Sequence, residues 1–141
     1  LVGSEMCIRD RFESAIDLLS YATLLKLDGN EWRREHLLSL AGVYQPAKEI
    51  EKSKVPAALA RALKMHPEVK TIVLHLDNDR IGRLATKAIF TVLPKQYQVK
   101  DVPPKQGKDY NDLLCIKLNL AITKREKRTK KTMSGHEKYE R

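Results

Sequence analysis

Cysteine is scarce in this sequence, and long hydrophobic runs are absent. Only Cys7 and Cys115 occur among 141 residues, and they form no CxxC pair and have no histidines at zinc-site spacing. Two scattered thiols are typical of a reducing cytosol, so we expect a cytoplasmic protein in which Cys115 serves only in packing. No apolar stretch approaches the length of a membrane span, and no segment of the given sequence has the layout of a secretory signal. The sequence therefore disfavours disulfide-stapled, zinc-binding and membrane-spanning classes.

Acidic residues are fewer than basic ones: 18 Asp and Glu against 27 Lys and Arg give a formal net charge of +9 at pH 7. The hydrophobic content of 42% is enough for one domain with a modest core. Residues 121–141 carry eight Lys or Arg and three Glu, and residues 119–141 are predicted to be a basic, flexible tail. A basic excess favours polyanionic partners such as DNA or RNA. For the tail itself a solvated segment is the first interpretation and a weak DNA contact the second.

The first eleven residues, LVGSEMCIRDR, do not resemble the start of a protein. MCIRDR resembles the translated end sequence that transposase-based sequencing libraries attach to DNA fragments. We therefore interpret residues 1–11 as a scar, with the natural chain entering near Phe12 in mid-domain. On this interpretation the strand before Glu13 is missing or replaced, and Arg9, Asp10 and Arg11 approach the sheet unpaired. We expect such a chain to be less stable than one with its natural upstream sequence.

The most informative stretch is VKTIVLHLDNDRIGRLATKAIF, residues 69–90. Its first part is β-branched and aliphatic, which predicts a buried parallel strand over Val69 to Leu76. Asp77-Asn78-Asp79 follows, and a helix is predicted after it. Ligands of open α/β sheets sit outside the carboxyl ends of strands, so Asp77 and Asp79 could converge on one Mg²⁺. Taken alone, the junction is equally consistent with a helix N-cap and a solvated strand end. The expected apolar face of the helix comprises Ile81, Leu84, Ala85, Ala88 and Ile89.

The remaining elements alternate between helices and strands. Ser14 and Asp17 predict a capping box for a helix ending near Leu27. A buried strand over His36 to Val43, a helix from Pro56 to about Met65, a strand over Gln98 to Val102 and a helix from about Tyr110 follow. This order predicts an α/β fold with a largely parallel sheet. The broad apolar face expected on the first helix comprises Ile16, Leu19, Tyr21, Leu24, Leu25 and Leu27.

Three motifs together resemble a Toprim domain: FESAID at a strand-to-helix junction, LDNDRIGRLA after a strand, and GKDYNDLL after a short strand. The chain is most similar to the Toprim-like versions in primase-like proteins of plasmids, phages and conjugative elements. The resemblance covers residues 12–118 and implies a small parallel sheet sandwiched by helices. It implies that Glu13, Asp77 and Asp79 hold Mg²⁺, or Mn²⁺ in its place, for phosphoryl-transfer chemistry on nucleic acid.

The need for a metal ion and an acid or base also follows from the general chemistry of phosphodiester reactions, without the family resemblance. A phosphodiester reaction needs charge neutralised on nonbridging oxygens, which Mg²⁺ supplies. Glu13 could complete the metal cluster, or act as a general acid or base if neighbouring carboxylates raise its pKa.

Several further side chains have both a functional and a plain interpretation. Asp109 and Asp112 could act near the metal or only stabilise a helix start. Lys105 and Lys108 could touch phosphate or be solvated, and Arg80 and Arg83 could face nucleic acid or solvent. His75 is expected to be a core histidine with satisfied hydrogen bonds rather than a ligand.

The sequence therefore predicts a DNA-binding, Mg²⁺-dependent Toprim-like part of a mobile-element replication or mobilisation protein. Its partners would be DNA or RNA and upstream domains of the same protein, with no membrane. Primase-type nucleotidyl transfer is favoured over strand cleavage. The alternative is a module of a larger relaxase- or primase-like protein that binds nucleic acid and catalyses nothing.

Overall fold

Four parallel strands form the sheet at the centre of the structure, a computed structural model that describes residues 7–120 except 35 and 43. The strands are β1 (Cys7–Phe12), β2 (His36–Ser39), β3 (Val69–His75) and β4 (Gln98–Asp101). Their order in the sheet is β2-β1-β3-β4, and every neighbouring pair is parallel. The structure confirms the predicted α/β fold with a small parallel sheet.

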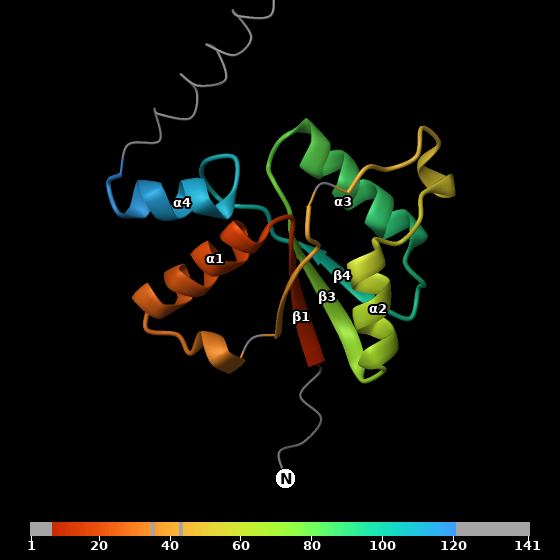
Figure 1. Cartoon of the computed structure of the whole chain (residues 1–141), viewed down its shortest axis with the longest axis horizontal. Helices are drawn as coiled ribbons and strands as arrows, with labels where there is room; N and C mark the ends of the chain where they lie inside the picture. The colour runs from red at the N-terminus through yellow and green to blue at the C-terminus, as the bar shows by residue number, and fades with distance from the viewer. Residues whose placement is uncertain (1–6, 35, 43, 121–141) are drawn as a thin grey trace, which may run out of the picture.

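The connections between the strands are helical, as parallel pairing requires. The helices are α1 (Ala15–Leu27), α2 (Ala57–Met65), α3 (Arg80–Val92) and α4 (Tyr110–Lys117), with short 3-10 turns η1 (Trp32–Arg34) and η2 (Ile50–Lys52). Figure 1 shows α1 and α4 on one side of the sheet and α2 and α3 on the other. None of the helices in the described part of the chain is long and apolar enough to cross a membrane.

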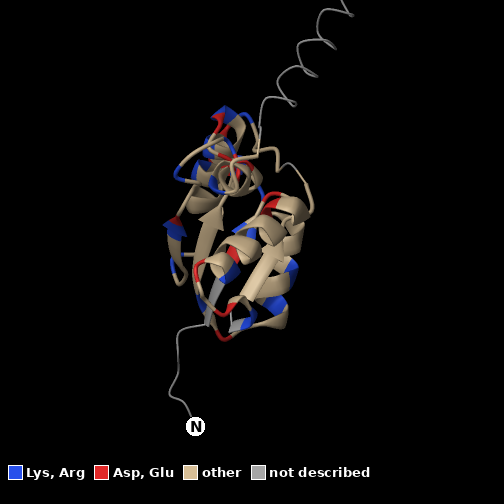
Figure 2. Ribbon diagram, turned by 90° about the vertical axis from the view of Figure 1, so that its left-hand side faces the viewer, with Lys and Arg blue, Asp and Glu red and all other residues tan. Residues whose placement is uncertain are grey.

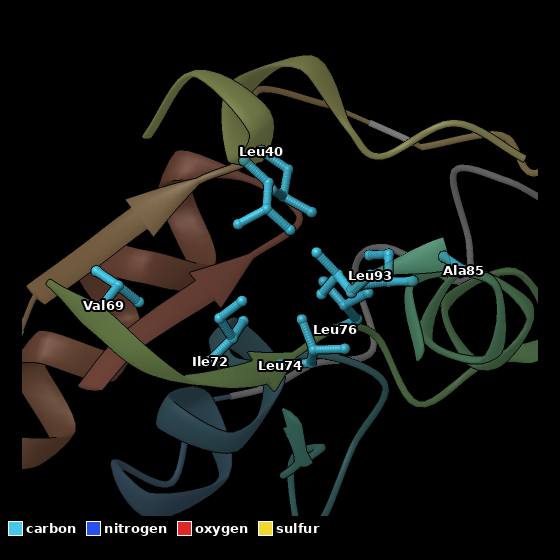
Figure 3. Close-up of a cluster of buried hydrophobic side chains, with 9 residues drawn as sticks. Leu40, Val69, Ile72, Leu74, Leu76, Ala85 and Leu93 are labelled. Atoms are coloured by element: carbon cyan, nitrogen blue, oxygen red, sulfur yellow. The ribbon is translucent and has the colours of Figure 1, made fainter. Parts of the chain in front are cut away.

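Two hydrophobic clusters hold these layers to the sheet. The larger one lies between the sheet and the helices α2 and α3, where Ile72, Leu74 and Leu76 alternate along β3 and its extension (Figure 3). The smaller one joins Phe12, Leu24 and Tyr110 on the opposite side. Because both faces of β3 are covered, its consecutive apolar residues Ile72, Val73 and Leu74 are the pattern expected of a central parallel strand.

The helix boundaries agree with the sequence prediction, but two predicted apolar faces are partly wrong. On α1, Ile16 and Leu19 are 57% and 64% exposed, whereas Asp17 and Ser20 are buried. The reason lies in α4: the main-chain N–H of Asn111 donates to Asp17, and Ser20 donates to the Asn111 side chain. On α3, Ile81 and Leu84 are exposed, while Gly82, Ala85, Thr86, Ala88 and Ile89 are buried.

The strand before Glu13 is present, which corrects the expectation that its charged residues stay unpaired. β1 occupies a central position, pairs with β2 and β3, and spans the boundary predicted between residues 11 and 12. Main-chain ladders need only N–H and C=O groups, which charged residues supply as well as apolar ones. Asp10 and Arg11 are 4% and 0% exposed. The origin of residues 1–11 as a library scar stays a prediction.

His75 confirms its expected place as a core histidine. Its Nε2 lies 2.7 Å from Asp10 Oδ1, and its Nδ1 lies 3.0 Å from both the Val102 carbonyl and the Tyr110 hydroxyl. The ring stacks on Phe12 with the ring centroids 4.8 Å apart. Burial raises the pKa of Tyr110, so its hydroxyl stays protonated and donates to the Val102 carbonyl. This network joins β1, β3 and α4 beneath the carboxyl edge of the sheet.

Candidate metal centre

The carboxyl ends of β1 and β3 meet where the strand order changes direction. β1 continues through α1 to β2 on one side, and β3 continues through α3 to β4 on the other. Open α/β sheets bind ligands in the crevice at such a point. Glu13 directly follows β1, and Asp77 and Asp79 follow β3. The topology therefore brings the three predicted acidic residues to the same edge of the sheet.

The turn after β3 is fixed by its contacts with the first turn of α3. Asp79 is the N-cap of α3, and its Oδ1 accepts a hydrogen bond of 2.8 Å from the Gly82 N–H. An added Cβ on Gly82 would lie 2.1 Å from the carbonyl oxygen of Asp77. A glycine is required here because the main chain of Asp77 passes directly over the helix. The N-cap interpretation of Asp79 is therefore correct and leaves its Oδ2 for another partner.

Arg83 holds the same turn from the side of β4. Its guanidinium donates to the carbonyls of Leu76 and Asp77 at 3.1 and 3.2 Å, and to Asp101 Oδ2 at 2.6 Å. Three donors in one planar group match these three acceptors, which a lysine could not do. The contacts of Arg83 are thus with the protein's own chain, whereas Arg80 is exposed.

Lys108 lies directly on the acidic pair. Its Nζ is 3.0 Å from Asp77 Oδ2 and 3.4 Å from Asp79 Oδ2. The Asp77 side chain is 9% exposed and that of Asp79 is 33% exposed. The two carboxylates therefore converge on one point, which an ammonium occupies in this structure, and the predicted Mg²⁺ at that point stays a prediction.

The site carries more negative charge than it readily accommodates. Burial, followed by the charge of Asp77, raises the pKa of Glu13. Burial also raises the pKa of Asp77, although Lys108 opposes this. Burial acts on Asp79 too, but hydrogen bonds from the Gly82 N–H and from Lys108 outweigh it and lower the pKa of Asp79. Asp77 and Asp79 raise the pKa of Lys108 against the effect of its burial. The carboxylates of this site therefore need a cation, and Lys108 supplies one in this structure.

These pKa directions give a pH-dependent prediction for Glu13→Gln without metal. A carboxyl whose folded-state pKa is raised stabilises the fold below its unfolded value, about 4.5, and loses that contribution as the pH rises through the folded value. At pH 7 the variant should therefore be more stable than the parent by about 0.5 kcal/mol, the scale of substitutions outside the core. At pH 4 the difference should vanish.

Urea unfolding of both proteins at the two pH values measures this effect. A variant that is less stable than the parent at pH 7, or equally shifted at both pH values, would contradict the assigned environment of Glu13.

The donor set at this edge suits Mg²⁺ or Mn²⁺. Both ions take carboxylate oxygens and need few protein ligands, because water completes the coordination of Mg²⁺. The Lys108 ammonium between Asp77 and Asp79 marks the place where a cation is bound. Among the described residues, no group of three or more His, Cys, Asp and Glu side chains is arranged to hold a metal ion. The assignment of Asp77, Asp79 and Glu13 as ligands of a metal ion therefore stays a prediction.

The other predicted site residues have identifiable positions. Asp109 is buried and is the N-cap of α4, where it accepts a hydrogen bond from the Asp112 N–H. Asp112 Oδ2 accepts a bond from the Lys108 N–H. Lys105 is exposed on the loop before α4. Asp109 and Asp112 therefore stabilise the start of α4, and Asp112 also shapes the loop that carries Lys108. A role of either residue near a metal stays a prediction.

Charge on the described surface is mixed rather than separated. Figure 2 shows Lys and Arg interspersed with Asp and Glu over the view that it presents. The strongly basic residues 121–141 lie outside the described residues.

Comparison with known proteins gives a match to one family. The family model described as Toprim-like matches residues 11–114. No curated protein matches the chain. Among solved structures, the chain is similar to the crystal structure of the primase fragment of bacteriophage T7 primase-helicase protein, with 24% identity and a TM-score of 0.49. That match covers 79% of this chain and 39% of the fragment, so the chain spans about two fifths of the fragment's length.

Proposed function

Because this chain belongs to the Toprim-like family, we propose that Asp77 and Asp79 bind Mg²⁺ for a nucleic-acid transaction, with Glu13 as the third carboxylate. Toprim domains generally bind Mg²⁺. The observation that carries the proposal is the convergence of Asp77 and Asp79 on one cation at the point where the strand order changes direction. The bound metal would neutralise charge on a phosphate.

The chain's own residues have separate tasks in this proposal. Asp77 and Asp79 are held by main-chain contacts of the turn, so their oxygens are preorganised. Glu13, with its raised pKa, can hold or release a proton nearer neutral pH than an ordinary carboxyl. The main-chain carbonyl of Glu13 accepts a 3.0 Å bond from the Gly42 N–H, which fixes its backbone. Glu13 is thus suited to accept the proton of an attacking hydroxyl.

Primase-type nucleotidyl transfer is the reaction we favour over strand cleavage. The resemblance of the FESAID, LDNDRIGRLA and GKDYNDLL motifs to primase-like proteins of mobile elements supports this order. The full-length protein would supply the other domains and the nucleic-acid partner. Metal-dependent extension and cleavage of labelled oligonucleotides, assayed side by side on the full-length protein, distinguish the two reactions.

A second candidate is a module that binds nucleic acid without catalysis. The absence, among the described residues, of a preformed group of three metal-binding side chains favours it. Under this hypothesis Glu13→Gln and Asp77→Asn leave every function of the full-length protein unchanged. Loss of metal-dependent activity with retained nucleic-acid affinity in the same variants would contradict it.

Nucleic-acid binding should be tolerant of sequence and strongly dependent on salt. The excess charge is spread over many residues, of which Arg80 and Lys105 are exposed near the candidate metal centre. Removing residues 124–141 should flatten the plot of log affinity against log salt, by about 0.9 for each duplex phosphate that those residues neutralise. Fluorescence anisotropy with DNA and RNA of several sequences measures this slope. An identical slope in the truncated chain would show that residues 124–141 make no phosphate contacts.

A further inference from the structure

Lys108 is the only cation that an ion pair joins to the acidic pair within the described residues. One ammonium bridges Oδ2 of Asp77 and Oδ2 of Asp79 at 3.0 and 3.4 Å. The lysine side chain is 54% exposed, while that of Asp77 is 9% exposed. The ammonium therefore approaches from the solvent side and lies on a carboxylate that has little exposure in this structure.

The backbone of Lys108 is held on both sides by the residues around the candidate metal centre. Its N–H donates to Asp112 Oδ2 at 3.1 Å, and its carbonyl accepts a 2.6 Å bond from the Asn78 N–H, between the two aspartates. Gly107, with φ of +77°, turns the chain immediately before it. The loop thus fixes the Cα of Lys108 beside the acidic pair, and only its flexible side chain is free to move.

An ammonium and a divalent cation need the same carboxylate oxygens. Two cations cannot share them at contact distance, because their mutual repulsion in a partly buried place is large. Resting on the proposed function, we propose that Lys108 is a built-in counter-ion: it neutralises Asp77 and Asp79 when no metal is bound, and a metal must displace it to bind. Once displaced, the anchored side chain presents a free ammonium to an anionic group of the substrate.

This positioning role has two consequences for the chain. Without metal, the counter-ion keeps the aspartates from repelling each other, so the turn after β3 stays ordered. With metal, the energy of breaking the two ion pairs is subtracted from the binding energy, so Lys108 lowers metal affinity. A lysine in solvent would affect neither the metal-free stability nor the metal affinity. A residue that helped to hold the metal would raise the metal affinity instead of lowering it.

The test compares Lys108→Met, which keeps an unbranched side chain but removes the ammonium, with Lys108→Arg and with the control Lys95→Met. Lys95 is exposed on the connection between α3 and β4, so the control removes the same charge elsewhere. Mn²⁺ affinity is measured by titration calorimetry, and metal-free stability by urea unfolding. We expect Lys108→Met to bind Mn²⁺ about tenfold more tightly than Lys95→Met. It should also unfold at a lower urea concentration without metal.

The outcomes separate this inference from the proposed function. Lys108→Arg should keep both properties near those of the parent, because the charge remains. Equal or weaker Mn²⁺ affinity in Lys108→Met than in Lys95→Met would overturn the displacement. If no protein in the series binds Mn²⁺, the proposed function fails and the displacement fails with it. The counter-ion role is then judged by metal-free stability alone, and unchanged stability would overturn it too.

Discussion

Replacing Asp77 and Asp79 together by asparagine should remove Mn²⁺ binding while the fold stays intact. Both side chains keep their shape but lose the negative charge that a divalent cation needs. The loss should be about 100-fold or more, since even an outer-sphere partner of a metal site contributes roughly 10–100-fold. Titration with Mn²⁺, followed by electron paramagnetic resonance, measures the free ion directly.

A matched control removes the same charge elsewhere. Asp28 and Glu49 are exposed and pair with Lys117 and Lys52, away from the candidate metal centre. Asp28→Asn with Glu49→Gln should leave Mn²⁺ affinity close to that of the parent. Circular dichroism checks that both double variants fold. If the Asp77 and Asp79 variant bound Mn²⁺ as tightly as this control, the metal assignment would be wrong.

Gly82→Ala should be strongly destabilising, although the same change in an ordinary helix is favourable. Alanine has the higher helix propensity, by about 1 kcal/mol, so the local effect is a gain. The new Cβ, however, would lie 2.1 Å from the Asp77 carbonyl oxygen and 3.0 Å from its Cα. Main-chain atoms cannot rotate aside as a side chain does, so we expect a net loss of about 3 kcal/mol, the upper part of the range for overpacking. Urea unfolding measures it.

The variant should also bind Mn²⁺ more weakly, because the turn that carries Asp77 must move. Gly29→Ala is the control: its φ is +78°, but nothing lies within 4 Å of the added Cβ. Gly29→Ala should lower the free energy of unfolding by about 1–2 kcal/mol, because alanine is strained in the left-handed conformation. Its Mn²⁺ affinity should be unchanged. A Gly82→Ala protein as stable as its parent would show that Asp77 does not pass over the helix as described.

The parts of the fold that local chemistry dictates could be predicted from the sequence. The β-branched run of β3 and the Asp77-Asn78-Asp79 junction are each recognisable within a few residues. The same holds for the cap of α1, where Ser14 accepts a bond from the Asp17 N–H. Hydrophobicity did not identify the buried face of α1, because apolar side chains surround that helix. Polar contacts of Asp17 and Ser20 with α4 orient it instead.

The contacts that depend on the order of the strands could not be predicted. Lys108 meets Asp77 only because the chain after β4, the neighbour of β3, turns back over the end of β3. A sequence pattern does not say which strand lies beside which. β1 escaped recognition for a different reason: Asp10 and Arg11 are not typical of a central strand. The side chain of Asp10 meets its partner His75 only after the sheet has formed.

The central position of β1 has a consequence for how the given chain refolds. One of the two neighbours of β1 is β3, with Cys7 opposite Val69 and Phe12 opposite His75. During refolding, β1 therefore keeps one edge uncovered until this distant segment has been brought beside it. Such long-range pairing slows folding and leaves strand edges open to other chains. We expect refolding yield to fall steeply with protein concentration, although the finished sheet covers both edges of β1.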